Sequence, residues 1–149
     1  SMQIVELFVS VAKPALKAEW NKEITALLRE LSEIEQFLVL EENENSTAQI
    51  SLTYDAQKLS IKEIEQRILN SNAYITDINI HFPSHITGIS DPLGASAVSI
   101  SLNNALKQID GVLGSTISSN GKLKVTIDTT SSFKQKVIEN ILSMFGAKH

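Results

Sequence analysis

Cysteine is absent from this chain of 149 residues. Without a thiol the chain can form no disulfide bond, and it has no thiolate for nucleophilic catalysis or for binding soft metal ions. The N-terminal region also lacks the basic and apolar pattern of a secretory signal peptide. Because disulfides are rare in the reducing cytosol, these absences lead us to expect a cytoplasmic protein.

Long apolar runs and dense basic stretches are missing as well. No run approaches the roughly 18 apolar residues of a membrane-spanning helix, so we expect no membrane span. Residues 1–82 hold 7 Lys and Arg against 13 Asp and Glu, and residues 83–149 hold 6 against 4. Neither half has the clustered positive charge that nucleic-acid binding requires. With 42% hydrophobic residues, the composition predicts a soluble, folded protein that binds no nucleic acid.

What the chain does contain is an internal repeat. Residues 17–34 have the apolar spacing of an amphipathic helix, and the same spacing returns 78 positions later in residues 95–112. The matching apolar residues are Trp20, Ile24, Leu27, Leu28, Leu31 and Ile34 in the first copy, and Val98, Leu102, Ala105, Leu106, Ile109 and Val112 in the second. A fixed offset of this kind indicates two units of similar structure.

The first half alternates between strand and helix patterns. Short apolar or alternating stretches predict strands at residues 3–10, 35–41, 49–54 and 74–82. Helices are predicted after Pro14 and after Ser60, where Ser60 and Glu63 match a capping box. The polar residues 42–46 predict a hairpin loop. The predicted order of this half is therefore βαββαβ.

The second half shows the same order with a weaker beginning. Its predicted elements are strands at residues 85–90, 112–118 and 123–127 and a helix at residues 95–110. Asn120 and Gly121 predict a hairpin turn, because both residue types tolerate positive φ. A last helix is predicted with Phe133, Val137, Ile141 and Met144 facing inward. Because only residues 147–149 follow it, we predict that the final strand is missing or truncated.

These patterns predict an α+β protein of two ferredoxin-like βαββαβ units in tandem. Each unit would have an antiparallel sheet with its helices packed on one face. We place the first unit at residues 2–82 and the second at residues 83–149. Units of this size bury little surface alone, so packing of the two units against each other is expected.

Short motifs in both units resemble one known family. Residues 105–112, ALKQIDGV, resemble the helix end and turn into the second strand of heavy-metal-associated domains, the small copper and zinc carriers also found in metal-pumping P-type ATPases. Residues 60–64, SIKEI, after Tyr54 and Asp55 resemble the third strand and second helix of that family. The resemblance implies the same ferredoxin-like fold over nearly the whole chain.

The metal-binding motif of that family is lost in both units. The family carries Gly-Met-x-Cys-x-x-Cys before its first helix, and two thiolates at that spacing bind Cu(I) or Zn(II). By alignment of the helix ends, the cysteine positions fall on Lys17 and Trp20 in the first unit and on Ala95 and Val98 in the second. None of these side chains is a thiolate, so a shared fold does not imply the family's metal chemistry here.

His81 and His85 are the remaining candidate metal ligands, since imidazole suits Zn, Ni or Cu(II). A structural zinc site needs four ligands, and the nearby acids stand at no recognised spacing. We therefore interpret both histidines as ordinary surface or linker residues and expect no bound metal and no cofactor. A metal-binding or transport-related function through this pair remains the first alternative.

Lys17 and Trp20 are the candidate interaction residues. In the metal carriers this loop contacts partner proteins, so the two side chains could form a contact surface taken over for another purpose. Trp20 also begins an apolar helix stripe, which favours a place in the core.

No catalytic pattern accompanies these residues. The serines Ser115, Ser118 and Ser119 have no nearby His and Asp signature, and no glycine-rich phosphate loop is present. We therefore predict a non-catalytic protein-interaction or regulatory module that binds an unknown protein or self-associates. The second alternative is a small-molecule or catalytic site in the cleft between the units.

Overall fold

The computed structural model describes residues 3–14, 19–41 and 46–146, with the side chains of 95–97 excepted. Its helices and strands follow one another along the chain in an order that repeats the strand–helix–strand pattern twice. They are β1 (Ile4–Ala12), α1 (Trp20–Arg29), β2 (Ile34–Glu41), β3 (Thr47–Asp55), α2 (Ile61–Asn70), β4 (Tyr74–Phe82), α3 (Ser84–Thr87), α4 (Pro92–Leu106), β5 (Val112–Ile117), β6 (Leu123–Ile127) and α5 (Lys134–Met144).

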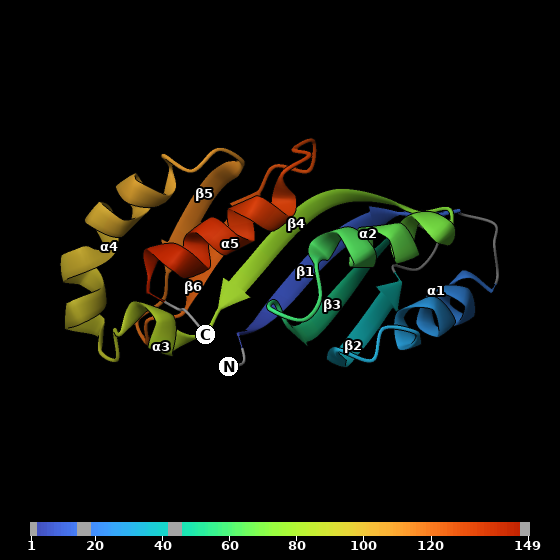
Figure 1. Ribbon diagram of the computed structural model, residues 1–149, viewed down its shortest axis with the longest axis horizontal. Helices are drawn as coiled ribbons and strands as arrows, with labels where there is room; N and C mark the ends of the chain where they lie inside the picture. Colours follow the sequence, from blue (N-terminus) through green and yellow to red (C-terminus); the bar gives the residue numbers. More distant parts are fainter. Residues whose placement is uncertain (1–2, 15–18, 42–45, 147–149) are drawn as a thin grey trace.

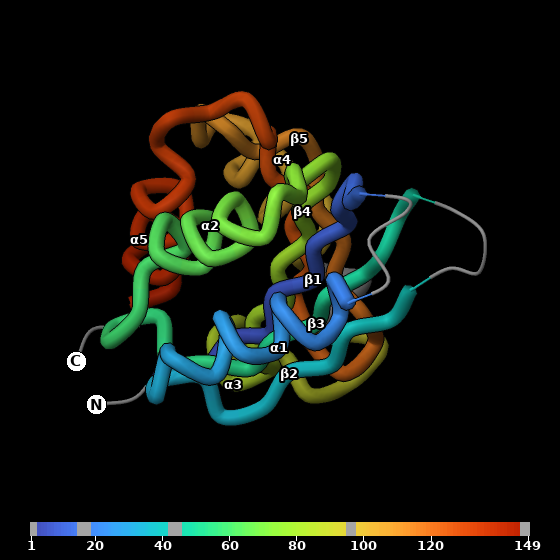
Figure 2. Tube along the Cα trace, turned by 90° about the vertical axis from the view of Figure 1, so that its right-hand side faces the viewer, coloured from blue at the N-terminus to red at the C-terminus, as the bar shows by residue number. Residues whose placement is uncertain are grey.

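All strands of the described residues belong to one antiparallel sheet. The strand order is β2-β3-β1-β4-β6-β5, so β2 and β5 form its two edges. Helices α1, α2, α5 and α4 follow one another along the sheet in Figure 1. Figure 2 looks along the molecule and shows α2 and α5 on one side of the sheet. The protein thus has the two-layer α+β architecture predicted from its sequence.

The two repeats share the central strands β1 and β4. The order β2-β3-β1-β4 is that of a complete ferredoxin-like unit. Reading from the other edge, β5-β6-β4-β1 gives the same order, with β4 as first strand and β1 as fourth. The second unit therefore does not need a final strand of its own, because β1 occupies that place. This explains why the chain shows no strand after α5 within the described residues.

An approximate twofold axis follows from the strand register. Glu6 lies opposite His81, and Phe8 lies opposite Asn79 in the β1–β4 pair. A twofold rotation that exchanges the two halves moves Glu6 onto the position of Asn79 and Phe8 onto the position of His81. The axis therefore relates these four positions in pairs. These side chains therefore surround the axis on the face of the sheet opposite the helices. Leu7 and Ile80 pair on the helix-bearing side and are fully buried.

Strand alternation and helix stripes build one core under the helices. In β1 the odd-numbered residues from Val5 to Val11 are buried, while the even-numbered ones are only partly covered. Helices α2 and α5 contact each other above the axis. There the amide of Ile61 donates to Oε1 of Gln135 at 3.0 Å, and Lys134 pairs with Glu65 at 3.1 Å. The predicted division at residues 82 and 83 falls at the end of β4 and stays a prediction.

The predicted strand at residues 85–90 is wrong. The chain forms the short helix α3 there, after Pro83 at the N-cap position, and Gly88 ends it with a left-handed φ of 69°. The place beside β6 that this strand would fill is already occupied by β4. The following helix also starts earlier than predicted, because Asp91 accepts a hydrogen bond from the amide of Gly94 and Pro92 fits the first helical turn.

The two predicted hairpins have different outcomes. Strands β2 and β3 pair as predicted, but residues 42–45 of their loop lie outside the described residues. The second hairpin turns at Gly121, whose φ is 82°. Asn120 instead acts through its side chain, which accepts from the hydroxyl of Ser118 and from the amide of Lys122. Within the described part of the chain, none of the helices has the length and apolar character needed to cross a bilayer.

Candidate functional site

The loop before each first helix is the place where the family resemblance puts a metal site. Lys17 lies outside the described residues. In the second unit, the positions from Pro92 to Val98 form the first turns of α4 and not a separate loop. A helical backbone spaces these side chains around its axis, so the geometry of the family's cysteine loop is not reproduced there.

Trp20 is part of the core. Its side chain is fully buried, and its indole nitrogen donates a hydrogen bond to Oγ of Ser71 at 3.1 Å. The hydroxyl of Ser71 in turn donates to the carbonyl oxygen of Ile68 at 2.6 Å. The ammonium of Lys13 lies 5.6 Å from the centre of the indole ring. A contact surface in this region would therefore have to be formed by the neighbours of Trp20, because its own ring joins α1 to the end of α2.

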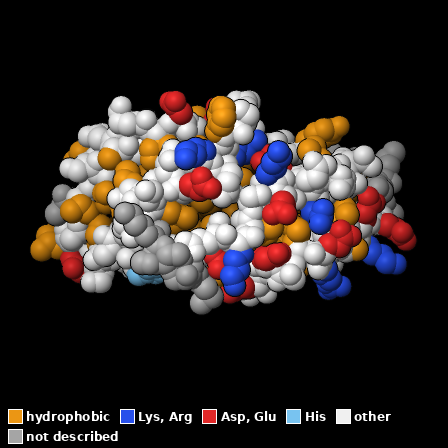
Figure 3. All heavy atoms as spheres, in the orientation of Figure 1, with side chains coloured by type: hydrophobic (Ala, Val, Ile, Leu, Met, Phe, Trp, Pro, Cys, Tyr) orange, Lys and Arg blue, Asp and Glu red, His pale blue; other side chains and the backbone are white. Residues whose placement is uncertain are grey.

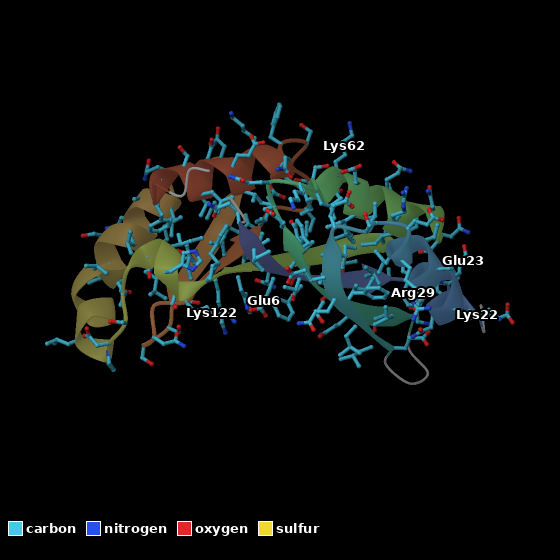
Figure 4. All side chains as sticks on the ribbon, turned by 60° about the horizontal axis from the view of Figure 1, so that its bottom comes forward. Glu6, Lys22, Glu23, Arg29, Lys62 and Lys122 are labelled. Atoms are coloured by element: carbon cyan, nitrogen blue, oxygen red, sulfur yellow. The ribbon has the colours of Figure 1, made fainter. Side chains whose placement is uncertain are left out.

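His81 lies on the open face of the sheet, at the approximate twofold axis. Its ring contacts the ring of Phe8 in a tilted arrangement, with 4.4 Å between the ring centres and 38° between the ring planes. Burial lowers the pKa of His81, and the nearby cations Lys122 and Lys124 lower it further, against an opposing effect of Glu6. Lys122 and Glu6 form an ion pair of 2.8 Å beside it, and Figure 4 shows these two side chains close together.

The two histidines do not form a metal centre with other ligands. His85 is exposed on α3, while Nδ1 of His81 is buried and lacks a hydrogen-bond partner among the described atoms. In the part of the chain that the structure describes, no group of three or more His, Asp or Glu residues is arranged to hold a metal ion. Two cationic ammonium groups near His81 also disfavour a bound cation.

The acids at the ends of β3 and β6, Asp55 and Asp128, have a structural role. Asp55 accepts from the amides of Gln3 and Gln57, both at 3.0 Å. Asp128 accepts from the amide and hydroxyl of Thr130, and these hydrogen bonds lower its pKa. Each carboxylate therefore caps the turn that leads to the second helix of its unit.

A groove of about 650 Å³ lies between the two halves, where the second alternative placed a ligand site. Its lining combines the start of α2 with the outer turns of α5, and includes Lys58, Ser60, Glu63, Gln135 and Glu139. The hydroxyl of Ser60 already accepts from the amide of Glu63, whose carboxylate accepts from the amide of Ser60. The amides of Ser60 and Glu63 at the start of α2 are therefore already bonded within the capping box.

Among the long helices of the described residues, α4 is the one without a charged residue. Its sequence is PLGASAVSISLNNAL, and its side chains of Leu93 and Ile100 are 81% and 74% exposed. By contrast, the equivalent helix α1 carries Lys22, Glu23 and Arg29, which are labelled in Figure 4. The offset between the copies matches Ile100 to Lys22, so an apolar side chain replaces a charged one at this position.

Exposed apolar residues continue beyond α4. Leu113 at the start of β5 is 64% exposed. On the helix-bearing side, Figure 3 shows apolar side chains and few charged ones over the end of the molecule that contains α4, while most charged side chains lie over the middle and the opposite end. We call Leu93, Ile100 and Leu113, with the edge of β5, the α4–β5 surface.

A groove of about 640 Å³ lies between the turn that follows α4 and the helix α5. Here the structure corrects the predicted last helix. Phe133 and Met144, predicted to face inward, are exposed and line the groove, whereas Val137, Ile138, Ile141 and Leu142 are buried. Phe133 is exposed because α5 begins at Lys134, which leaves Phe133 at the N-cap position outside the helix.

Sequence reasoning missed the α4–β5 surface as a candidate site. The repeat predicts two similar amphipathic helices and does not distinguish the outer side of the second helix from that of the first. The available signal was the absence of Lys, Arg, Asp and Glu from Pro92 to Leu106, since an ordinary surface helix carries charge on its outer side.

No protein-family model matches the chain, and no curated protein matches it either. Among solved structures, it is similar to the water-soluble region of the P-type ATPase CopA from Bacillus subtilis, with 12% identity and a TM-score of 0.42 over 99% of this chain and 88% of that one. The N-terminal extension of CzcP from Cupriavidus metallidurans has 21% identity and a TM-score of 0.35, over 95% and 97%.

The regulatory subunit of aspartate kinase from Thermus thermophilus is a further similar structure, with 9% identity and a TM-score of 0.34 over 96% of this chain and 93% of that one. Likenesses this weak carry no argument about function. The resemblance to heavy-metal-associated domains therefore stands at the level of the ferredoxin-like fold, which the strand order establishes by itself.

Proposed function

We propose that this chain is a non-catalytic protein-interaction or regulatory module and that the α4–β5 surface is its contact surface. The observation that carries the proposal is the uncharged helix α4, with Leu93 and Ile100 exposed to solvent. Contiguous apolar surface is costly to leave in water, and on soluble proteins it usually marks a binding site.

The matched helix α1 supports this assignment. Both helices cover an edge of the same sheet in equivalent places, so the fold alone does not require an uncharged outer side. Helix α1 has Lys22 and Glu23 where α4 has Ile100 and Ser101. A requirement specific to the second half, such as a partner that covers α4, accounts for this difference.

Partner capture with matched variants tests the proposal. The tagged wild-type chain, Ile100→Lys and the control Leu40→Lys would be incubated with lysate of the source organism, and retained proteins identified by mass spectrometry. Leu40 lies on β2 and is exposed, so the control adds the same charge at the opposite edge. We expect proteins that the wild type and the control retain and that Ile100→Lys loses at least tenfold. Equal retention by all three would refute the assigned surface.

Metal binding through His81 is the second candidate function, because Nδ1 of this residue has no hydrogen-bond partner among the described atoms. It is the weaker candidate, since the nitrogen is buried beside Phe8 and two lysines. Native mass spectrometry after addition of Zn(II), Cu(I) or Ni(II) decides this point. A one-to-one adduct that His81→Ala abolishes would establish a metal carrier, and a co-purifying organic molecule in the same spectrum would favour the groove between the halves.

A further inference from the structure

We propose that two copies of this chain associate through the α4–β5 surface, with the edge strand β5 of each copy pairing antiparallel to β5 of the other. The inference rests on the proposed interaction function and names its partner as a second copy of this chain. The pairing would join the two sheets into one and place the two α4 helices next to each other across a twofold axis.

The edge strand β5 is open to such pairing. Within the described residues it pairs with β6 on one side only, and its sequence VLGSTI contains neither a charge nor a proline. Natural edge strands are usually protected against pairing by charged residues or proline. The opposite edge has this protection, because β2 carries Glu35 and Glu41, and Glu41 also pairs with Lys13 at 3.2 Å.

Helix α4 lies against β5, at the same end of the molecule. Leu93 and Ile100 stand seven residues apart and therefore share one side of the helix, while Leu106 is buried on another side. Pairing of two β5 strands would bring two α4 helices close enough to cover these exposed side chains. The unprotected strand and the uncharged helix thus occur at one edge, and both of their protected counterparts occur at the other.

Charge favours a second copy as the partner. A twofold contact uses the same surface on both copies, and near its axis a residue lies close to its own equivalent, so a charge placed there meets a like charge. The α4–β5 surface has none, whereas a contact between two β2 edges would bring Glu35 and Glu41 of both copies together. The first half of the chain, residues 1–82, is net negative, with 13 Asp and Glu against 7 Lys and Arg. Its outer edge at β2 would lie at the far ends of the dimer.

The size of the surface sets the expected strength. A helix of 15 residues is about 22 Å long, and a strand of six residues spans about 20 Å. A contact of these dimensions falls at the small end of specific interfaces, which is typical of reversible complexes. We therefore expect a weak dimer with a dissociation constant on the order of tens of micromolar.

Analytical ultracentrifugation over a concentration series tests the dimer with the intact chain. The wild type should sediment as a 16.4 kDa monomer at about 1 µM and approach twice that mass at about 500 µM. Ile100→Lys on the helix and Thr116→Lys on the exposed side of β5 should each weaken association at least tenfold. The control Leu40→Lys at the opposite edge should leave it unchanged. Far-UV circular dichroism and thermal melts would show that each variant is folded.

The possible outcomes separate the two proposals. A wild-type chain that stays monomeric over the whole range refutes the dimer, while the partner-capture experiment still decides the interaction function. A dimer that Ile100→Lys does not weaken refutes α4 as part of the contact. A dimer weakened by Ile100→Lys but not by Thr116→Lys refutes the joined sheet, and a dimer lost only in Leu40→Lys places the interface at β2.

Discussion

The hydrogen bond between Trp20 and Ser71 gives a quantitative test of the core. Both side chains are fully buried, and the indole N–H donates to the serine hydroxyl at 3.1 Å. Substitution of Ser71 by alanine removes the acceptor and leaves a buried donor without a partner, which costs about 1–3 kcal/mol. The carbonyl of Ile68 also loses the bond from Ser71 but still accepts from the amides of Ser71 and Ala73. We therefore expect Ser71→Ala to lower the free energy of unfolding by about 2 kcal/mol.

The matched change is Trp20→Phe, which removes the donor and part of the ring. The lost hydrogen bond and the space left in the core should together cost about 2–3 kcal/mol. Once Trp20 is phenylalanine, no donor is left without a partner, so adding Ser71→Ala should cost only about 0.5 kcal/mol. The double variant should then be more stable than the sum of the single changes predicts, by about 1–2 kcal/mol.

Urea unfolding followed by far-UV circular dichroism measures all four proteins, since the single tryptophan is absent from two of them. Tryptophan emission in the wild type should also be shifted to short wavelength and resist quenching by acrylamide. Additive effects, or a Ser71→Ala cost below about 0.5 kcal/mol, would refute the argument. If Trp20→Phe weakened partner capture without changing stability, Trp20 would be a contact residue and not a core residue.

Two further predictions concern His81 and the glycines of the second unit. The pKa of His81 in the folded protein lies below its ordinary value of 6.5. As pH falls, the unfolded chain therefore takes up a proton first, and the free energy of unfolding of the wild type should decrease below about pH 6.5. His81→Gln should show a smaller loss in urea unfolding between about pH 7.5 and pH 5, and an equal loss would contradict the prediction. Gly121→Ala should cost at least about 2 kcal/mol, because φ is 82° and the added methyl group would overlap the carbonyl of Ile89. Gly114→Ala, with nothing within 4 Å of the added group, should change stability by less than about 0.5 kcal/mol, and similar effects of the two substitutions would contradict the packing argument.

Local patterns predicted the first half of the fold well. The alternation from Val5 to Val9 marked the buried side of β1, and the capping box at Ser60 and Glu63 marked the start of α2. Both signals depend on residues close together in the chain. The stripe of α1 also placed Trp20 correctly in the core, where the structure adds its hydrogen bond to Ser71 across 51 positions.

The second half was predicted less well, because its neighbours come from the first half. The repeat predicts a strand at residues 85–90. In the structure β4 already pairs with β6, so no free edge remains there for such a strand. Phe133 fitted a helix stripe by spacing alone, yet the helix begins one residue later and the side chain remains exposed. The sequence shows that α1 carries charged residues and that α4 carries none. Only the structure shows that the two helices lie at opposite edges of the sheet.

The sequence by itself determined most of the helices and strands and the two-layer α+β class, since periodicity and caps act over a few residues. Only the tertiary structure decided that β1 and β4 serve both units. Strand pairing is a long-range choice, made where a strand finds both a free edge and a buried side for its apolar residues. That choice closes the centre of the sheet and leaves β5, with the uncharged α4 over it, as the open edge that the proposed dimer would cover.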